Sequence, residues 1–288
     1  MSSRSIRTLH RAVRDDIGEL QTRRPLPSES LDQIDPFLFL NHHGPQVYPP
    51  RNRGLPFGPH PHRGFETVTF IVEGLLAHRD TGGHESVIHA GGVQWMTAGR
   101  GLEHAEISPE EFLERGGPLE ILQLWVNLPS RLKMVEPRYA GLQREQIPSF
   151  TAGEGGVTVS LISGSWDQQR GPIESLTGVQ MMTVEVPAGG RLALPAPRER
   201  NVFLYVVRGE VGVSGESAGA FHLVEMNEDG DEIELEARTG AMVVFGHAAP
   251  LGEPVVAHGP FVMNTRDEIE QAVRDYRAGK FRGVLDLG

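Results

Sequence analysis

The sequence predicts an all-β protein built from two β-barrel domains and a short C-terminal helix. The 35 glycines and 21 prolines among 288 residues favour many turns and short strands over long helices. Residues 66–72 form a β-rich run that ends at a glutamate and a glycine, as expected for a strand followed by a tight turn. Residues 202–208 repeat this pattern in weaker form, so the second half of the chain is expected to copy the first.

The first domain is expected over residues 1–135, and its central stretch carries two pairs of candidate metal ligands. His60 and His62 open this stretch, and His104 and Glu106 close it. Both pairs have i, i+2 spacing, so each pair would point to one face of an extended strand. Two such strands inside a barrel would aim three imidazoles and a carboxylate at one point. That donor set suits a divalent first-row metal with open coordination positions.

The context of these pairs matters more than the pairs themselves. With 12 histidines in the chain, a His-x-His pair is expected by chance about 0.5 times, so one pair alone is weak support. Here each pair adjoins a β-rich run and a turn. Glu66 is an alternative carboxylate ligand, because strict alternation would place it on the same face as His60 and His62. We favour Glu106, in which case Glu66 would accept a hydrogen bond from a ligand imidazole.

Other polar residues near the pairs are predicted to be structural or solvated. His42 and His43 are adjacent, so their side chains point to opposite faces and cannot chelate as a pair. His78, His84 and His89 lie in a turn-rich region without i, i+2 pairing, which predicts surface histidines. Loop arginines at positions 51, 53 and 63 are also expected to be solvated, the alternative being that they attract an anionic substrate.

A charged segment with several prolines predicts a linker over residues 136–150 and a second domain over residues 151–288. Alignment of the glycines that follow the two β-rich runs puts Pro195 and Pro197 at the positions of the first ligand pair. Counting on from Gly240 puts Gly252 and Pro254 at those of the second pair. Neither residue type has a metal-binding side chain, so the second barrel is predicted to be a metal-free copy.

The end of the chain has the pattern of an amphipathic helix. Thr265 and Glu268 match a capping box, and Gly279 is a plausible stop. An apolar stripe at i, i+4 and i+7 is formed by Ile269, Val273 and Tyr276. We expect this helix to cover a barrel.

Composition excludes several classes of function. The net charge of −11 argues against direct nucleic-acid binding, which depends on lysine and arginine contacts to phosphate. The chain has no cysteine, so disulfides, thiolate metal sites and cysteine nucleophiles are ruled out. The first residues lack the apolar core of a secretory signal, and no run of 18 apolar residues predicts a membrane span. A cytoplasmic protein without membrane contact is therefore expected.

Four segments resemble the pirin family of the cupin superfamily. They are HPHRGFETVTFIVEG from His60, QWMTAGRGLEHAE from Gln94, LQLWVNLPSRLKMVEP from Leu122 and HGPFVMNT from His258. The resemblance reaches from about residue 35 to about residue 280. It implies a bicupin, that is, two cupin or jelly-roll barrels. It also implies iron in the N-terminal barrel, with the family's ligands falling on His60, His62, His104 and Glu106.

The resemblance also implies a reaction. Several pirins have quercetin 2,3-dioxygenase activity, in which a flavonol binds metal through its deprotonated 3-hydroxyl and is opened by O2 with loss of carbon monoxide. Glu106 would be a ligand and the candidate general base. The alternative is an iron- or redox-responsive partner of a transcription factor or metabolic enzyme. A storage-type or sugar-modifying cupin is disfavoured by the pirin-like segments. The residues do not separate iron from manganese, nickel or copper.

Overall fold

The computed structural model describes residues 2–285 and divides into two compact units, each assembled from three segments of the chain. Unit 1 comprises the chain up to Val13, Arg24–Leu38 and Gln146–Pro250. Unit 2 comprises Arg14–Arg23, Phe39–Glu145 and the chain from Leu251 onward. The middle segment of unit 2 thus ends inside the predicted linker. The boundaries 1–135, 136–150 and 151–288 stay predictions of the sequence.

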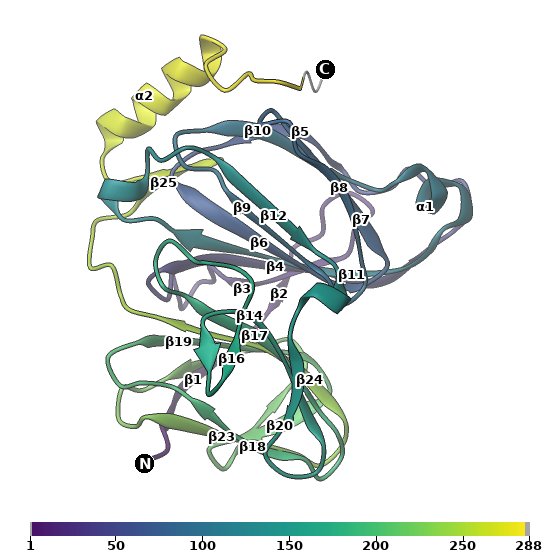
Figure 1. The fold of residues 1–288 in the computed structure, drawn as a ribbon, viewed down its shortest axis with the longest axis vertical. Helices are drawn as coiled ribbons and strands as arrows, with labels where there is room; N and C mark the ends of the chain where they lie inside the picture. The colour runs from purple at the N-terminus through teal and green to yellow at the C-terminus, as the bar shows by residue number, and fades with distance from the viewer. Residues whose placement is uncertain (1, 286–288) are drawn as a thin grey trace. The chain divides into compact units, whose positions relative to one another are not determined.

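Unit 2 is built around a large and a small antiparallel sheet (Figure 1). Within the described chain the large sheet runs in the order β12 (Arg138–Leu142), β9 (Val93–Thr97), β6 (Phe65–Glu73), β11 (Gly117–Asn127), β4 (Phe37–Tyr48), β3 (Thr22–Leu26) and β2 (Val13–Arg14). This sheet also includes the ends of β2, β3 and β4 that are assigned to unit 1. The small sheet runs β5 (Phe57–His62), β10 (Leu102–Ile107), β7 (Leu75–Asp80) and β8 (Glu85–His89). Ile71 and Ile121 from the large sheet pack against Leu76 and Ile88 from the small one. Short helices α1 (Glu110–Arg115), η1 (Ser130–Leu132) and η2 (Arg144–Gln146) connect strands.

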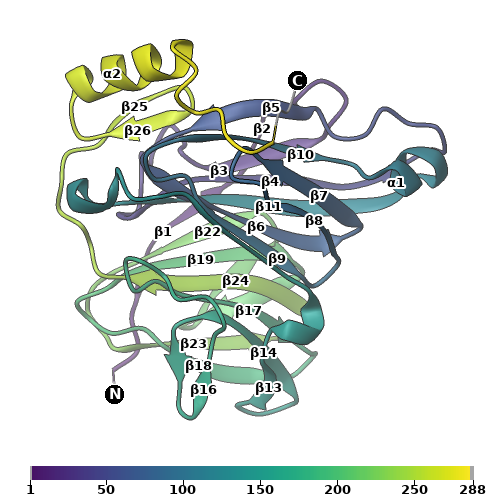
Figure 2. The same ribbon diagram turned by 45° about the horizontal axis from the view of Figure 1, so that its top comes forward.

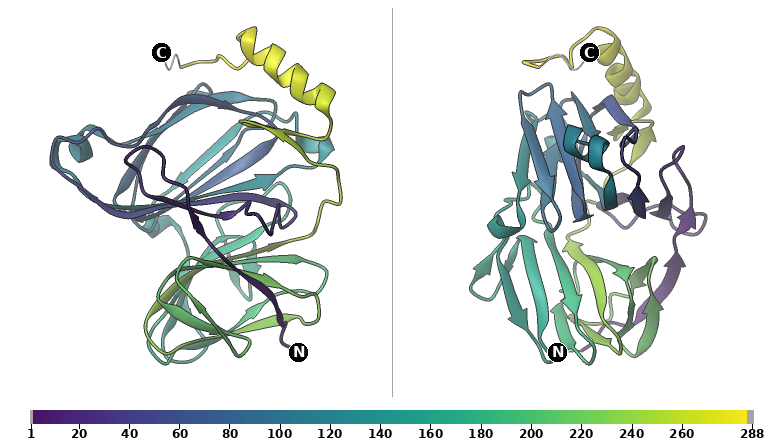
Figure 3. Two further views of the ribbon diagram at one scale, coloured as in Figure 1. Left: turned by 180° about the vertical axis from the view of Figure 1, so that it is seen from behind. Right: turned by 90° about the vertical axis from the view of Figure 1, so that its right-hand side faces the viewer.

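Unit 1 repeats this plan. Over the residues described, its large sheet runs β1 (Ile6–Arg11), β22 (His222–Met226), β19 (Asn201–Arg208), β24 (Ala241–Ala248), β17 (Gln180–Val186), β14 (Val157–Ser163) and β13 (Ser149–Ala152). Its small sheet runs β18 (Arg191–Pro195), β23 (Glu232–Ala237), β20 (Glu210–Val213) and β21 (Glu216–Gly219). A hairpin of β15 (Ser165–Trp166) and β16 (Gln169–Arg170) is added. Figure 3 shows the purple N-terminal strand β1 among the green strands of this unit.

The matching strand orders confirm the predicted all-β fold of two cupin barrels with a short C-terminal helix. They also correct the predicted alignment of the two halves. Two residues separate β5 from β6, whereas five separate β18 from β19, so counting back from the shared glycine is wrong by three positions. In addition, β24 takes the place of β11 rather than that of β9, which is taken by β22. Pro195, Pro197, Gly252 and Pro254 are therefore not the counterparts of the ligand pairs.

The C-terminal segment belongs to unit 2. It forms the hairpin β25 (Val256–His258) and β26 (Phe261–Met263) and then helix α2 (Arg266–Arg277), drawn in yellow in Figure 2. The predicted capping box is present, with Thr265 as the N-cap and reciprocal hydrogen bonds to Glu268. The predicted apolar stripe is wrong in part, because Tyr276 is exposed while Asp275 is buried. Among residues 2–285, no helix is both long and apolar enough to cross a membrane.

Candidate metal centre

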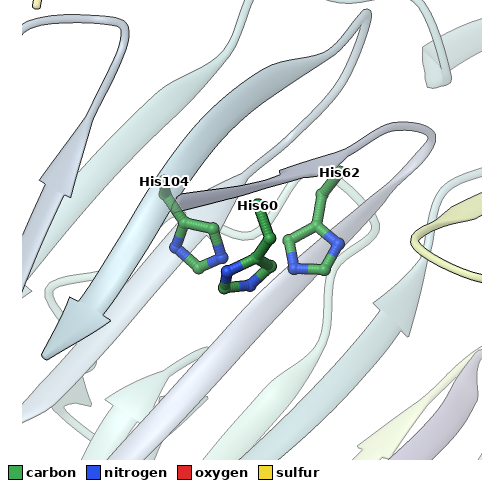
Figure 4. Close-up of side chains that lie close together, drawn as sticks. All are labelled: His60, His62 and His104. Atoms are coloured by element: carbon green, nitrogen blue, oxygen red, sulfur yellow. The ribbon is translucent and has the colours of Figure 1, made fainter. Parts of the chain in front are cut away.

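The small sheet of unit 2 brings three histidines together. His60 and His62 lie on β5 and His104 on the neighbouring strand β10, where His104 pairs directly with His60. One ligand nitrogen of each lies within 4.8 Å of the others. The ring centroids are 4.4 Å apart for His60 and His104 and 4.9 Å apart for His62 and His104. Figure 4 shows the three rings gathered at one place. The cluster can therefore hold a metal ion.

Backbone carbonyls fix which nitrogens face this point. His60 Nδ1 lies 2.7 Å from the Gly58 carbonyl oxygen, and His62 Nδ1 lies 3.3 Å from that of Pro260. A carbonyl only accepts, so each Nδ1 carries the proton and each Nε2 keeps its lone pair. Among the described residues, His62 Nε2 and both nitrogens of His104 are buried without a hydrogen-bond partner. Such orphaned nitrogens are costly, and a metal ion would satisfy them.

The protonation states also fit a metal. Burial, together with the neighbouring His60, lowers the pKa of His62 to about 3. Burial and the neighbouring histidines hold the pKa of His104 well below its usual 6.5. Neutral imidazoles are the form that binds metal, so little proton release would accompany binding at these two residues near pH 7. The donor set matches the predicted imidazole site, in a chain without thiolates.

Glu106 shares a strand with His104 but makes other contacts. One of its carboxylate oxygens accepts a hydrogen bond from Thr69 Oγ1 at 2.8 Å, and the other accepts one from Gln123 Nε2. In the described part of the chain it is not a member of the three-histidine group. Its predicted roles as fourth ligand and general base stay predictions.

Glu66 makes its hydrogen bond within the large sheet, and its place as the alternative to Glu106 stays a prediction. It accepts a hydrogen bond of 2.6 Å from Thr97, its partner across the β6–β9 ladder. Thr69, three residues along β6, lies on the other face, where it reaches Glu106. The alternation fails because the turn after His62 carries the chain from the small sheet into the large one. Burial raises the pKa of Glu66.

His78 is buried beside the cluster, so its prediction as a surface histidine is wrong. Its ring centroid is 5.4 Å from that of His104, and it stacks on Tyr139 at 4.0 Å. His78 Nε2 lies 2.9 Å from Asp80 Oδ2, and the Asp80 carboxylate also contacts His84 Nδ1 at 3.0 Å. The position follows from the pairing of β7 with β10, which local spacing does not reveal. The i, i+2 pair formed by His78 and Asp80 was the signal that could have found it.

The remaining polar residues divide between core and surface. His42 Nε2 lies 2.8 Å from Glu120 Oε1, with both side chains buried, and His43 Nδ1 lies 2.8 Å from Thr22 Oγ1. Neither belongs to the three-histidine group in the described residues. Among the predicted surface residues, His89 is exposed, whereas Arg63 is buried.

Aromatic side chains form one side of the centre. The Trp125 ring lies 5.3 Å from His62, and Phe65 and Phe39 pack on Trp125 at 4.3 Å and 4.6 Å. Trp125, Phe39 and Gln123 are half-buried. A single aromatic residue in an apolar run gives no sign of facing a site, so the sequence alone does not indicate this position of Trp125.

Comparisons with known proteins give the family. A family model described as Pirin matches residues 19–126, and one described as Pirin C-terminal cupin domain matches residues 181–282. A Pseudomonas aeruginosa protein named "Putative quercetin 2,3-dioxygenase PA3240" is 40% identical over 92% of this chain and 93% of its own. Human Pirin is 36% identical over 96% of this chain and 92% of its own length. The crystal structure of a quercetin 2,3-dioxygenase from Acinetobacter baumannii superposes with a TM-score of 0.89 at 31% identity, covering 99% of this chain and all of that one. The chain belongs to the pirin family.

Proposed function

We propose that unit 2 binds one divalent metal ion, iron in the cell, through His60, His62, His104 and Glu106. We further propose that the chain is a quercetin 2,3-dioxygenase-type enzyme. The observation that carries the proposal is the set of three converging imidazoles, two of which have buried nitrogens without a hydrogen-bond partner among the described residues. The relatives named for this reaction support the choice of chemistry.

The surroundings suit a planar aromatic substrate. The stacked rings of Trp125 and Phe39 offer an aromatic surface beside His62, on which a flavonol can stack. When bound, the metal would supply an electrophilic position for the flavonol oxygen and access to O2. Both atoms of O2 enter the product as the ring opens, and one carbon leaves as carbon monoxide.

Glu106 would take the proton of the flavonol 3-hydroxyl. Each of its oxygens accepts one hydrogen bond, from Thr69 and from Gln123, so each retains a lone pair for a further proton. The two donors also fix the orientation of the carboxylate, which proton transfer at a defined atom requires.

The test is aerobic quercetin turnover by the metal-free protein reconstituted with one metal at a time. We expect loss of quercetin absorbance with carbon monoxide release, dependent on metal and abolished in His62→Ala. His89→Ala, an exposed histidine of the same unit, is the matched control and should behave as wild type. If the protein binds one metal ion per chain but turns over no flavonol, the enzyme hypothesis is wrong, and an iron-responsive binding protein is favoured.

The role of Glu106 is tested separately with Glu106→Gln. We expect reduced turnover, because the amide cannot accept the proton. If the variant retains its metal and its turnover is undiminished, Glu106 is not the general base.

A further inference from the structure

Both strands that carry the three histidines end at turns that contact the C-terminal segment. Arg63 and Gly64 directly follow His62, and Arg100 and Gly101 directly precede β10. Gly64 has φ +90°, and a Cβ there would lie 2.0 Å from the Val262 carbonyl oxygen. Gly101 has φ +121°, and a Cβ there would lie 2.5 Å from the Phe281 ring. Both turns therefore need glycine, because the C-terminal segment approaches them so closely.

Arg63 joins the two turns to helix α2. Its Nε donates to the Arg100 carbonyl at 2.6 Å, which ties one turn to the other. Its Nη1 donates to Asp275 Oδ2 at 2.9 Å, and its guanidinium lies 4.7 Å from the centre of the Phe281 ring. Arg63 and Asp275 are both buried. Asp275 also pairs with Lys280 at 2.7 Å through its other oxygen. The buried Arg63 charge would be costly without Asp275, so the pair is a strong geometric constraint on Arg63.

The hairpin before α2 holds the first turn through the backbone. The Pro260 carbonyl accepts from the Arg63 backbone N–H and from His62 Nδ1, each at 3.3 Å. The Val262 N–H donates to the Arg63 carbonyl at 3.0 Å. The buried Lys133 ammonium donates to the Gly64 and Val262 carbonyls, each at 2.9 Å, and so locks the two segments together.

These contacts are made at the ends of β5 and β10, the strands that carry the three histidines. A helix that only covered the barrel would not need contacts concentrated there. We propose that the C-terminal segment, residues 256–281, is a positioning element of the metal centre. The Pro260 carbonyl holds His62 as the Nδ1–H tautomer with Nε2 toward the metal. The Arg63–Asp275 pair sets the spacing of His62 and His104 by fixing both turns. This inference rests on the proposed metal site for its functional meaning, while the orientation of His62 can be measured without metal.

The first experiment compares metal affinity in Arg63→Lys and Asp275→Asn with wild type, using cobalt(II) as the probe. Each variant should bind cobalt about tenfold more weakly, as is typical when a residue that orients a ligand is changed. The visible absorption of bound cobalt should also change, because it reports ligand geometry. Asp275→Glu keeps the charge and should recover part of the affinity. The matched control is Glu270→Gln, which removes an exposed carboxylate of the same helix and should change affinity less than twofold.

The second experiment uses the metal-free protein, with imidazole ¹⁵N shifts from long-range ¹H–¹⁵N NMR. Wild type should show His62 as the Nδ1–H tautomer, and Arg63→Lys and Asp275→Asn should show a mixture. Folded variants with the wild-type tautomer, cobalt affinity and cobalt spectrum would overturn the positioning role and leave α2 as cover. If wild-type protein binds no metal at His62, the proposed metal centre falls instead, and the ¹⁵N shifts still decide whether the segment positions His62.

Discussion

The two units share one strand plan and fill it with opposite chemistry. In unit 2, His104 is flanked by His60 and Asp80 across the small sheet, and Glu106 pairs with His78. In unit 1, Leu235 is flanked by Leu192 and Val213, and Ala237 pairs with Val211. His62 corresponds to Leu194 by the same register. All of these unit 1 residues are buried members of one apolar cluster.

The difference shows what stabilises each unit at these positions. At these positions unit 1 is stabilised by apolar burial alone, so they contain no polar side chain that needs a hydrogen-bond partner. Unit 2 gives up that burial and keeps imidazole nitrogens without partners, which lowers stability unless something binds them. A site that is costly for folding and ready for a ligand is typical of function. Replacing a residue of one unit by its counterpart in the other therefore tests directly whether the three histidines of unit 2 form a metal site.

The largest effect is expected for His104→Leu, which gives unit 2 the counterpart residue of unit 1. Metal affinity should fall roughly a thousandfold, equivalent to about 4 kcal/mol. The free energy of unfolding of the metal-free protein should rise by about 1–2 kcal/mol, because two orphaned nitrogens are removed. Metal titration and urea unfolding with a chelator check both parts. A metal-free variant less stable than wild type would contradict this account.

The reverse exchange, Leu235→His, should destabilise the protein by about 3 kcal/mol without creating a metal site. The imidazole would enter an apolar cluster that offers it no hydrogen-bond partner. Urea unfolding measures the loss, and metal content measured after dialysis should equal that of wild type. Leu235→Met is the volume-matched control and should cost much less. An unchanged midpoint for Leu235→His would show that the interior of unit 1 tolerates polarity.

A smaller effect is expected from pH on the metal-free protein. The pKa of His62 is about 3 in the folded chain and about 6.5 when unfolded, so the unfolded state binds more protons between these values. Stability should therefore fall as the pH drops through this window, by about 2 kcal/mol from about pH 8 to about pH 5 for His62 alone. His62→Leu should remove this part of the slope. His247, whose pKa is also lowered to about 3 by burial, contributes equally to both proteins. If the stability of wild type and of His62→Leu depends on pH with the same slope, the low pKa assigned to His62 is wrong.

The comparison also shows which features were predictable from sequence. The clustering of His60, His62 and His104 could be predicted because i, i+2 spacing is a local property of strands, and the β-rich runs predicted two barrels. His78 was misplaced because its position depends on which strands pair in the sheet, a long-range property. The counterparts of the ligands were missed by three positions because the turn between β18 and β19 is longer than its equivalent. The contacts of Arg63 with the C-terminal segment join residues more than 200 positions apart in the chain, and no local pattern encodes them.

The smallest effect concerns the polar pair next to the histidine cluster. His78 and Asp80 are hydrogen-bonded at 2.9 Å, and their counterparts in unit 1 are Val211 and Val213. Either single change, His78→Val or Asp80→Val, leaves a buried partner short of a hydrogen bond and should destabilise the protein. The double variant should cost less than the sum, with a coupling of about 1 kcal/mol measured by urea unfolding. His84 still contacts Asp80 in His78→Val, so this single change should be the milder of the two. Strict additivity would mean that the pair contributes nothing beyond packing, and that the polar row of unit 2 ends at the three histidines and Glu106.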